Sequence, residues 1–193
     1  MTTKKLEYFG AEDRIGLNLL NNNTHFLLGE IAEENVNACV KWIVSENLTA
    51  KTGSILTIYI NSQGGDLYEA LGLIDVMKCS NLTIRTVGYG SIMSAGFLIF
   101  ASGTKGERYI AKNTGIMCHQ FSSTEDVGKY HDIKATRKET DRLNKAMYDI
   151  LKDATGLDGR IIKHKLLPAS DVYMSAEDMI GYGAADYILE GVA

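Results

Sequence analysis

Apolar and polar residues follow two patterns along this chain, one typical of buried strands and one typical of helices. Glycine-rich stretches at residues 61–66 and 88–94 are predicted to be turns, and Gly29 is predicted to close the first strand. Strands and helices that alternate predict an α/β core with parallel strands and right-handed crossovers. Short β-branched and apolar runs predict strands at residues 24–28, 54–60, 82–87, 108–110 and 115–118. Apolar residues three and four apart predict helices at residues 31–47 and 95–102 and around Leu67, Leu71, Ile74 and Met77.

The rest of the chain follows other patterns. Residues 1–23 show no periodic pattern of apolar residues and are predicted to be an arm or a frayed terminus. Residues 130–154 form a long charged segment with one apolar stripe, and Gly156 fits the stop signal of a helix. A helix this long and polar need not pack fully on its own sheet, so we expect it to protrude and meet another subunit. The remaining predicted elements are a helix at 158–166, a short helix opened by the capping box at 175–178, and a strand at 185–189.

Composition narrows the function classes open to the chain. Its 193 residues are 45% hydrophobic and 23% charged, which predicts one globular domain over residues 1–193. A net charge of −4 argues against a nucleic-acid partner, and no apolar run is long enough to span a bilayer. The first residues do not resemble a signal peptide, and three cysteines without a CxxC pair favour reduced thiols. His25, His131 and His164 are not spaced as metal ligands. We therefore expect a cytoplasmic protein without a metal site.

Three polar residues stand near the ends of predicted strands or the starts of predicted helices. Taken singly, Ser94 is most simply a helix cap, His119 a residue satisfied at a strand end, and Asp171 a turn residue. Taken together, they are the nucleophile, base and orienting carboxylate that a serine hydrolase needs. The backbone amides of Gly64-Gly65 and Ala95 could stabilise an oxyanion beside them. Periodicity alone leaves open whether these residues meet.

Four segments, taken in order, make the chain similar to a known family. The segments are Tyr59-Ile-Asn-Ser-Gln-Gly-Gly65, Ser94-Ala-Gly96 with Phe97-Leu and later Gly103-Thr-Lys-Gly-Glu-Arg108, Ile116-Met-Cys-His-Gln120, and Asp171-Val-Tyr-Met-Ser175. They resemble the hallmark segments of ClpP, the proteolytic subunit of the ATP-dependent Clp protease, and the resemblance covers residues 24–188, most of the chain.

The resemblance implies a site as well as a fold. Ser94 would be the nucleophile, His119 the base and Asp171 the orienting acid. The backbone amides of Gly65 and Ala95 would form the oxyanion hole. The fold would be crotonase-like, with mostly parallel sheets, surrounding helices, an N-terminal arm at 1–23 that forms an axial gate, and a protruding handle at 120–156.

An assembly is implied too. The family forms two stacked seven-membered rings, a tetradecamer that encloses the serines, and an AAA+ unfoldase such as ClpX or ClpA docks on its ends. Unfolded proteins or peptides would be the substrates. The chain has no GxxxxGK[ST] motif, so the partner would use the ATP and no cofactor is expected here.

Several positions depart from the family pattern. Gln63 and Phe121 stand where the family usually has Pro, Ala95 where it has Met, and Ser170 where an Arg takes part in ion pairing between rings. Residues 122–128 replace a glycine-rich handle strand. This divergence suggests a bacteriophage or accessory copy. Three alternatives stay open: a non-catalytic or modulatory ring subunit, a crotonase-type acyl-CoA enzyme, and a phage head maturation protease.

Overall fold

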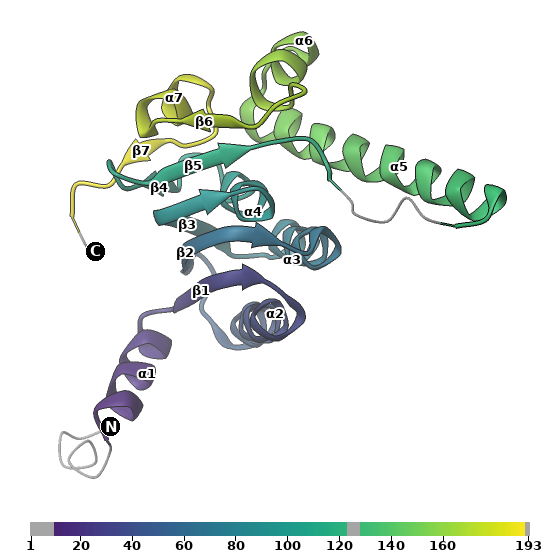
Figure 1. The fold of residues 1–193 in the computed structure, drawn as a ribbon. Coiled ribbons are helices and arrows are strands. Elements are labelled where there is room, and N and C mark those ends of the chain that lie inside the picture. Colours follow the sequence, from purple (N-terminus) through teal and green to yellow (C-terminus); the bar gives the residue numbers. More distant parts are fainter. Residues whose placement is uncertain (1–9, 123–127, 192–193) are drawn as a thin grey trace.

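A seven-stranded sheet runs through the part of the chain that the structure describes, residues 10–122 and 128–191 of a computed structural model (Figure 1). Its strands are β1 (Thr24–Ile31), β2 (Ile55–Gly65), β3 (Thr83–Met93), β4 (Arg108–Ile110), β5 (Gly115–Cys118), β6 (Val172–Met174) and β7 (Tyr187–Ile188). The helices are α1 (Ala11–Asn21), α2 (Glu33–Thr49), α3 (Leu67–Cys79), α4 (Ala95–Ala101), α5 (Tyr130–Thr155), α6 (Gly159–Ile161) with a π-helical turn at Ile162–Leu166, and α7 (Ala176–Gly181).

Strand order follows chain order across most of the sheet. β1, β2, β3, β4 and β7 are neighbours in that sequence, and every one of these pairs is parallel. β3 is shared, because its middle pairs with β4 and its end pairs with β5. β6 is antiparallel to β5. The predicted α/β architecture with mostly parallel strands is confirmed.

The core lies between this sheet and the adjoining helices α2, α3 and α4 (Figure 1), and the second half of α5 also contributes buried residues to it. Every residue of α4 is buried, and Phe97 and Phe100 are completely enclosed. Each such phenylalanine contributes about 1.5–3 kcal/mol through burial. The helix that follows Ser94 therefore has a rigid setting, which matters for the site described below.

Glycine-rich stretches predicted to be turns are strands instead. Residues 61–65 continue β2, residues 88–93 continue β3, and β1 does not end at Gly29 but bulges there and runs on to Ile31. The glycines allow close approach: a side chain at Gly88 would collide with Ile110, and one at Gly90 would collide with Asn61. The prediction failed because glycine signals both turns and close contacts.

Within the predicted N-terminal arm, residues 11–21 form a helix, α1, that the sequence pattern did not predict. Residues 1–9 lie outside the described part of the chain. The Gly10 N–H donates to the Asp13 carboxylate at 3.3 Å, which helps to start the helix. No residue of α1 is buried, and Ile15 and Leu20 are more than half exposed. The helix therefore stands away from the body (Figure 1).

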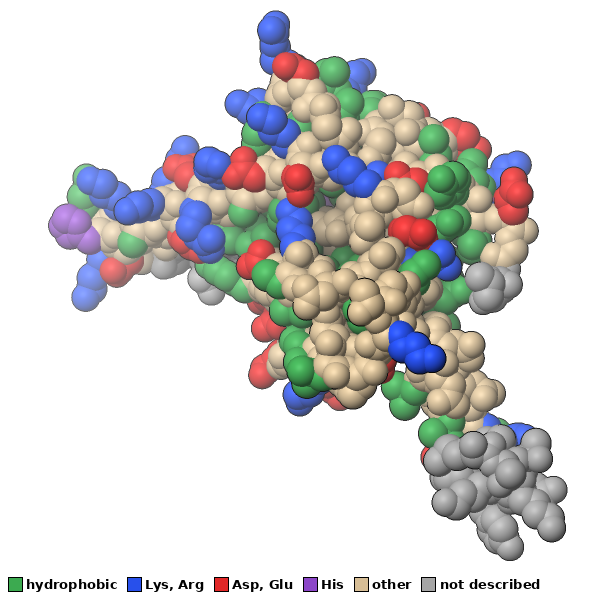
Figure 2. All heavy atoms as spheres, turned by 180° about the vertical axis from the view of Figure 1, so that it is seen from behind, with side chains coloured by type: hydrophobic (Ala, Val, Ile, Leu, Met, Phe, Trp, Pro, Cys, Tyr) green, Lys and Arg blue, Asp and Glu red, His purple; other side chains and the backbone are tan. Residues whose placement is uncertain are grey.

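The predicted long helix is α5, and it ends at Gly156 in a left-handed conformation as expected. Leu143 is its first buried residue, so residues 130–142 project about 20 Å beyond the core. Lys and Arg side chains are numerous on this projecting part (Figure 2). The predicted handle strand at 122–128 lies mostly outside the described residues.

Two buried polar features shape the interior. Arg108, 3% exposed in its side chain, pairs with Asp186 at 2.7 Å and also donates to the carbonyls of Ala101 and Ala154. Trp42, 7% exposed, stacks on His25 with ring centroids 5.3 Å apart. Among the described residues, the indole Nε1 of this tryptophan is the one buried side-chain polar atom without a hydrogen-bond partner.

Candidate active site

Ser94 is held in a strained turn between β3 and α4. Its φ of 52° and ψ of −123° lie in a region that residues with side chains rarely occupy, a strain of about 1–3 kcal/mol. The alternative interpretation as a helix cap does not hold, because the side chain makes no capping hydrogen bond. The Oγ atom instead lies 2.7 Å from Nε2 of His119. The turn presents a hydroxyl to a base, as the strained nucleophile turns of serine hydrolases do.

The sheet register brings His119 to this position. β5 pairs in parallel with the end of β3, so that Met117 lies opposite Met93. The Ser94 N–H donates to the Met117 carbonyl at 2.9 Å. His119 follows two residues later, immediately after β5. Both side chains of the Ser94–His119 pair are half-buried, which leaves them open to a substrate.

Asp171 lies near this pair without being joined to it. It directly precedes β6, a three-residue strand where the sequence predicted a loop. Cys118 is opposite Val172 in the antiparallel ladder, so Asp171 occupies the next position, level with His119. Its carboxylate is exposed, and no hydrogen bond or ion pair between the described residues links it to His119. The structure therefore brings two of the three predicted residues together.

A pair of glycines makes room for Ser94. A Cβ atom at Gly64, where φ is +105°, would stand 2.6 Å from the Cβ of Ser94 and 3.2 Å from its Oγ. A side chain at Gly65 would overlap the carbonyl of Ile31. Ser62, 1% exposed, steadies this end of β2 because its Oγ accepts from the Gly64 N–H at 3.1 Å. The Gly-Gly pair in the sequence indicated a close approach, whereas nothing there marked Ser62.

A pocket of about 240 Å³ opens beside the serine. The Ala95 N–H belongs to the first residue of α4, where a helix leaves its amides without internal partners. The predicted nucleophile and both predicted amide donors thus line one cavity, and its remaining walls could hold an apolar side chain. Its lining residues are Gly65, Asp66, Leu67, Tyr68, Ser94, Ala95, Phe121, Ser122 and Met147.

Comparison with known proteins shows the family of this chain. The profile of the Clp protease family matches residues 11–192. The chain belongs to the Clp protease family. It is also 31% identical over 188 residues to the ATP-dependent Clp protease proteolytic subunit 1 of Prochlorococcus marinus (strain MIT 9312), a match that covers 96% of this chain and 94% of that protein. The family membership predicted from four short segments is confirmed, and this family is one of peptidases.

Three departures from the Clp protease family pattern fall at the site, and one of them, Ala95, lines the pocket beside Ser94. Phe121, where the family usually has Pro, lines the pocket beside Ser94. Gln63 is exposed and lines a neighbouring hollow of about 590 Å³ with Glu30 and Ser91. Ser91, the other serine of this segment, makes no hydrogen bond with His119 in the described structure.

The Cys118 thiol beside the site is not positioned for chemistry. Burial raises the pKa of the Cys118 thiol to about 12, although a hydrogen bond from the His119 backbone acts in the opposite direction. The thiol therefore stays protonated and unreactive. Across residues 10–122 and 128–191, no three His, Cys, Asp or Glu side chains are grouped to hold a metal ion. None of the described helices is long and apolar enough to cross a membrane.

Proposed function

We propose that this Clp protease family member is a serine endopeptidase that hydrolyses unfolded proteins or peptides inside an oligomeric ring. The observation that carries the proposal is the 2.7 Å contact between Ser94 Oγ and His119 Nε2, made by a serine in a strained turn. The amides of Gly65 and Ala95 on the same pocket support it.

In the proposed mechanism, Ser94 Oγ attacks the peptide carbonyl while His119 Nε2 takes its proton. The tetrahedral oxyanion accepts hydrogen bonds from the amides of Gly65 and Ala95, which are in place before the charge develops. His119 then gives the proton to the leaving amine, and the C–N bond breaks. Water attacks the remaining acyl-enzyme by the same route and frees Ser94. A substrate would lie in extended form along the groove edge, as an added strand.

Asp171 is proposed as the residue that orients His119. The carboxylate would turn from solvent toward Nδ1 of the imidazole and so keep Nε2 free to accept the Ser94 proton. The two backbones are neighbours at the end of the β5–β6 ladder, where opposite Cα atoms are about 4.5–5.5 Å apart. A change of side-chain rotamer would therefore suffice, without any strand movement.

The assembly is part of the same proposal. Two stacked seven-membered rings of this chain would enclose the serines, with the projecting part of α5 reaching a neighbouring subunit. An AAA+ unfoldase such as ClpX or ClpA would deliver substrates and hydrolyse the ATP, so that this chain needs no cofactor. We place the protein in the cytoplasm on the same reasoning.

Labelling with a fluorophosphonate probe across a size-exclusion profile tests the proposal. The wild type is expected to be labelled in a high-mass peak, and Ser94→Ala is expected to keep that peak but lose the label. Asp171→Asn should lower peptidase turnover by about 10⁴-fold if the carboxylate orients His119. Labelling that persists in Ser94→Ala would reject Ser94 as the nucleophile.

The exposed carboxylate of Asp171 favours a second candidate function, that of a non-catalytic or modulatory ring subunit. Such a subunit would assemble with an active sibling and leave its own His119 without an orienting partner. A high-mass peak without label, together with co-purification of another peptidase subunit, would select this alternative.

A further inference from the structure

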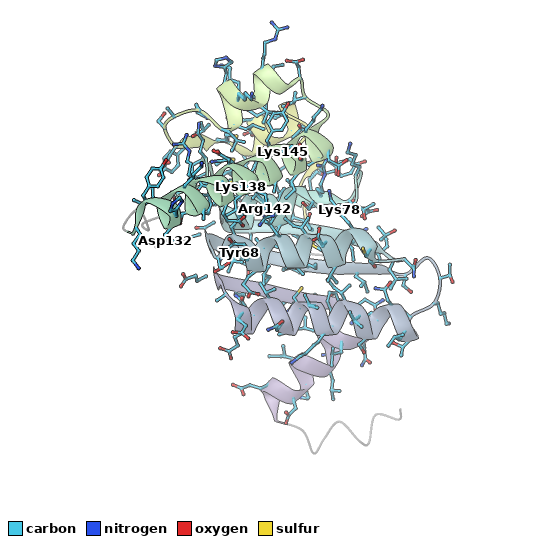
Figure 3. The ribbon with its side chains drawn as sticks, turned by 90° about the vertical axis from the view of Figure 1, so that its right-hand side faces the viewer. Tyr68, Lys78, Asp132, Lys138, Arg142 and Lys145 are labelled. Atoms are coloured by element: carbon cyan, nitrogen blue, oxygen red, sulfur yellow. The ribbon has the colours of Figure 1, made fainter. Side chains whose placement is uncertain are left out.

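Three side chains join α5 to the start of α3. The hydroxyl of Tyr68 on α3 donates to Oε1 of Glu139 on α5 at 2.8 Å, across 71 residues of sequence. Arg142, on the same helix as Glu139, donates to both oxygens of this carboxylate at 2.6–3.1 Å. We call these three residues the latch. Figure 3 shows Tyr68 and Arg142 near one another where α5 passes α3.

One end of the latch is anchored beside the candidate active site. Asp66 immediately follows the Gly64-Gly65 pair, and its carboxylate caps α3 by accepting from the N–H groups of Tyr68 at 2.7 Å and Glu69 at 3.2 Å. Tyr68 also lines the pocket that holds Ser94. The tyrosine is thus fixed to Asp66, which directly follows the proposed oxyanion donor at the end of β2.

The other end is on the helix that supplies the opposite part of that pocket. Met147, two turns after Glu139, lines the pocket directly. Asn144 holds Phe121 in place, because its Oδ1 accepts from the Phe121 N–H at 3.0 Å. A movement of α5 at this level would therefore carry Phe121 and Met147 with it and change the shape of the pocket.

Packing alone does not fix α5 at this point. Leu143 is its first buried residue, so Glu139 lies one turn outside the core. Between residues 130 and 142, the bond from Tyr68 is the one side-chain hydrogen bond or ion pair from α5 to the body among the described residues. Hydrogen bonds from Arg142 and Tyr68 lower the pKa of Glu139 to about 2. The carboxylate is therefore charged at neutral pH and remains a strong acceptor.

We propose that the latch positions α5 against the Ser94 pocket and so determines how tightly the pocket binds the substrate side chain next to the scissile bond. The inference rests on the proposed peptidase function. Tyr68, Glu139 and Arg142 are positioning residues in this account, because the latch acts through Phe121 and Met147. Its loss should weaken substrate binding more than it slows the chemical step.

The chain offers a matched control for this idea. Asp153 is another exposed α5 carboxylate that accepts from α3, in this case from Lys78 at 2.8 Å, at the opposite end of the helix pair. Figure 3 shows Lys78 well separated from Tyr68 along α3. Glu139→Ala and Asp153→Ala therefore each remove an α5 carboxylate that accepts a hydrogen bond from a side chain of α3, the first near the pocket and the second far from it.

The experiment measures KM and kcat for a fluorogenic peptide with an apolar residue before the scissile bond. Glu139→Ala is expected to raise KM by about threefold to fivefold, as for a half-exposed charged pair, and to change kcat by less than twofold. Glu139→Gln keeps an acceptor oxygen for Tyr68 and should restore most of the affinity. Asp153→Ala should leave both constants at the wild-type values. Equal effects of the two alanine variants would overturn the proposal.

A second readout does not depend on catalysis. Hydrogen exchange of residues 130–146, followed by mass spectrometry, should be faster in Glu139→Ala and Tyr68→Phe and unchanged in Asp153→Ala. Unchanged exchange in Glu139→Ala would refute the latch even if the enzyme were inactive. A wild type that takes no fluorophosphonate label would instead reject the peptidase function, so the two failures are distinguishable.

Discussion

Replacing Gly64 by alanine would test whether the end of β2 and the Ser94 turn are fitted to one another. The added Cβ would stand 2.6 Å from the Cβ of Ser94, about 0.8 Å short of ordinary contact at 3.4 Å. It would also approach the Met93 carbonyl at 3.1 Å and Ser94 Oγ at 3.2 Å. Something has to move, and the nearest atoms belong to the Ser94 side chain and the Met93 carbonyl.

The size of the effect follows from that distance. A displacement of about 0.8 Å would stretch the 2.7 Å contact between Ser94 and His119 beyond hydrogen-bond range. Misplacing a reacting group by about 1 Å reduces rates by about 10²-fold. An alanine at the Gly64 φ of +105° adds strain of about 1–3 kcal/mol. We therefore expect a large loss of activity with a moderate loss of stability.

The rate of fluorophosphonate labelling and the thermal unfolding midpoint measure the two effects separately. Gly72→Ala is the control, because a Cβ at this position in α3 meets nothing within 4 Å. That variant should label at the wild-type rate and gain about 0.5–1 kcal/mol of stability. If Gly64→Ala labels within threefold of the wild type, the steric reasoning is wrong.

Two further predictions concern the interior. Asp186→Asn leaves the buried Arg108 guanidinium without its counter-ion and should destabilise the fold by about 3–5 kcal/mol in urea unfolding. Burial alone would raise the pKa of Asp186, but hydrogen bonds and the charge of Arg108 hold it below its ordinary value of 3.8. The stabilisation of the fold by the ionised Asp186 is therefore complete above about pH 4 and is lost as pH falls through the lowered pKa. In an acid titration, the stabilities of the wild type and Asp186→Asn should therefore differ at higher pH and converge as pH falls through that pKa. Iodoacetamide at pH 8 should alkylate the exposed Cys79 in the native protein, whereas the buried Cys39 and Cys118 should react only after unfolding. Rapid modification of Cys118 in the native protein would contradict its enclosed position.

The sequence predicted those elements best whose signals are local. The bounds of β4 and β5, the start of α4 and the end of α5 at Gly156 agree with the structure, because periodicity and a helix stop signal act over a few residues. The three-residue strand β6 was missed, since only its pairing with β5 makes it a strand.

The sequence predicted which residues form the candidate site better than it predicted how they are arranged. Residue type and order pointed to Ser94 and His119, and the β3–β5 register that joins them is a tertiary feature. The direction in which Asp171 points depends on a side-chain rotamer, which no sequence pattern encodes. The contact between Tyr68 and Glu139 spans 71 residues and combines two ordinary surface positions, so only the folded chain reveals it.

The stacked pair of Trp42 and His25 makes this chain a convenient object for optical spectroscopy. Trp42 is the only tryptophan in the sequence, so the tryptophan emission comes from one point between α2 and β1. Burial lowers the pKa of His25, so a neutral imidazole faces the indole at pH 7. A red shift of the emission would therefore report the opening of the N-terminal half of the sheet, while motions of α5 would leave the spectrum unchanged.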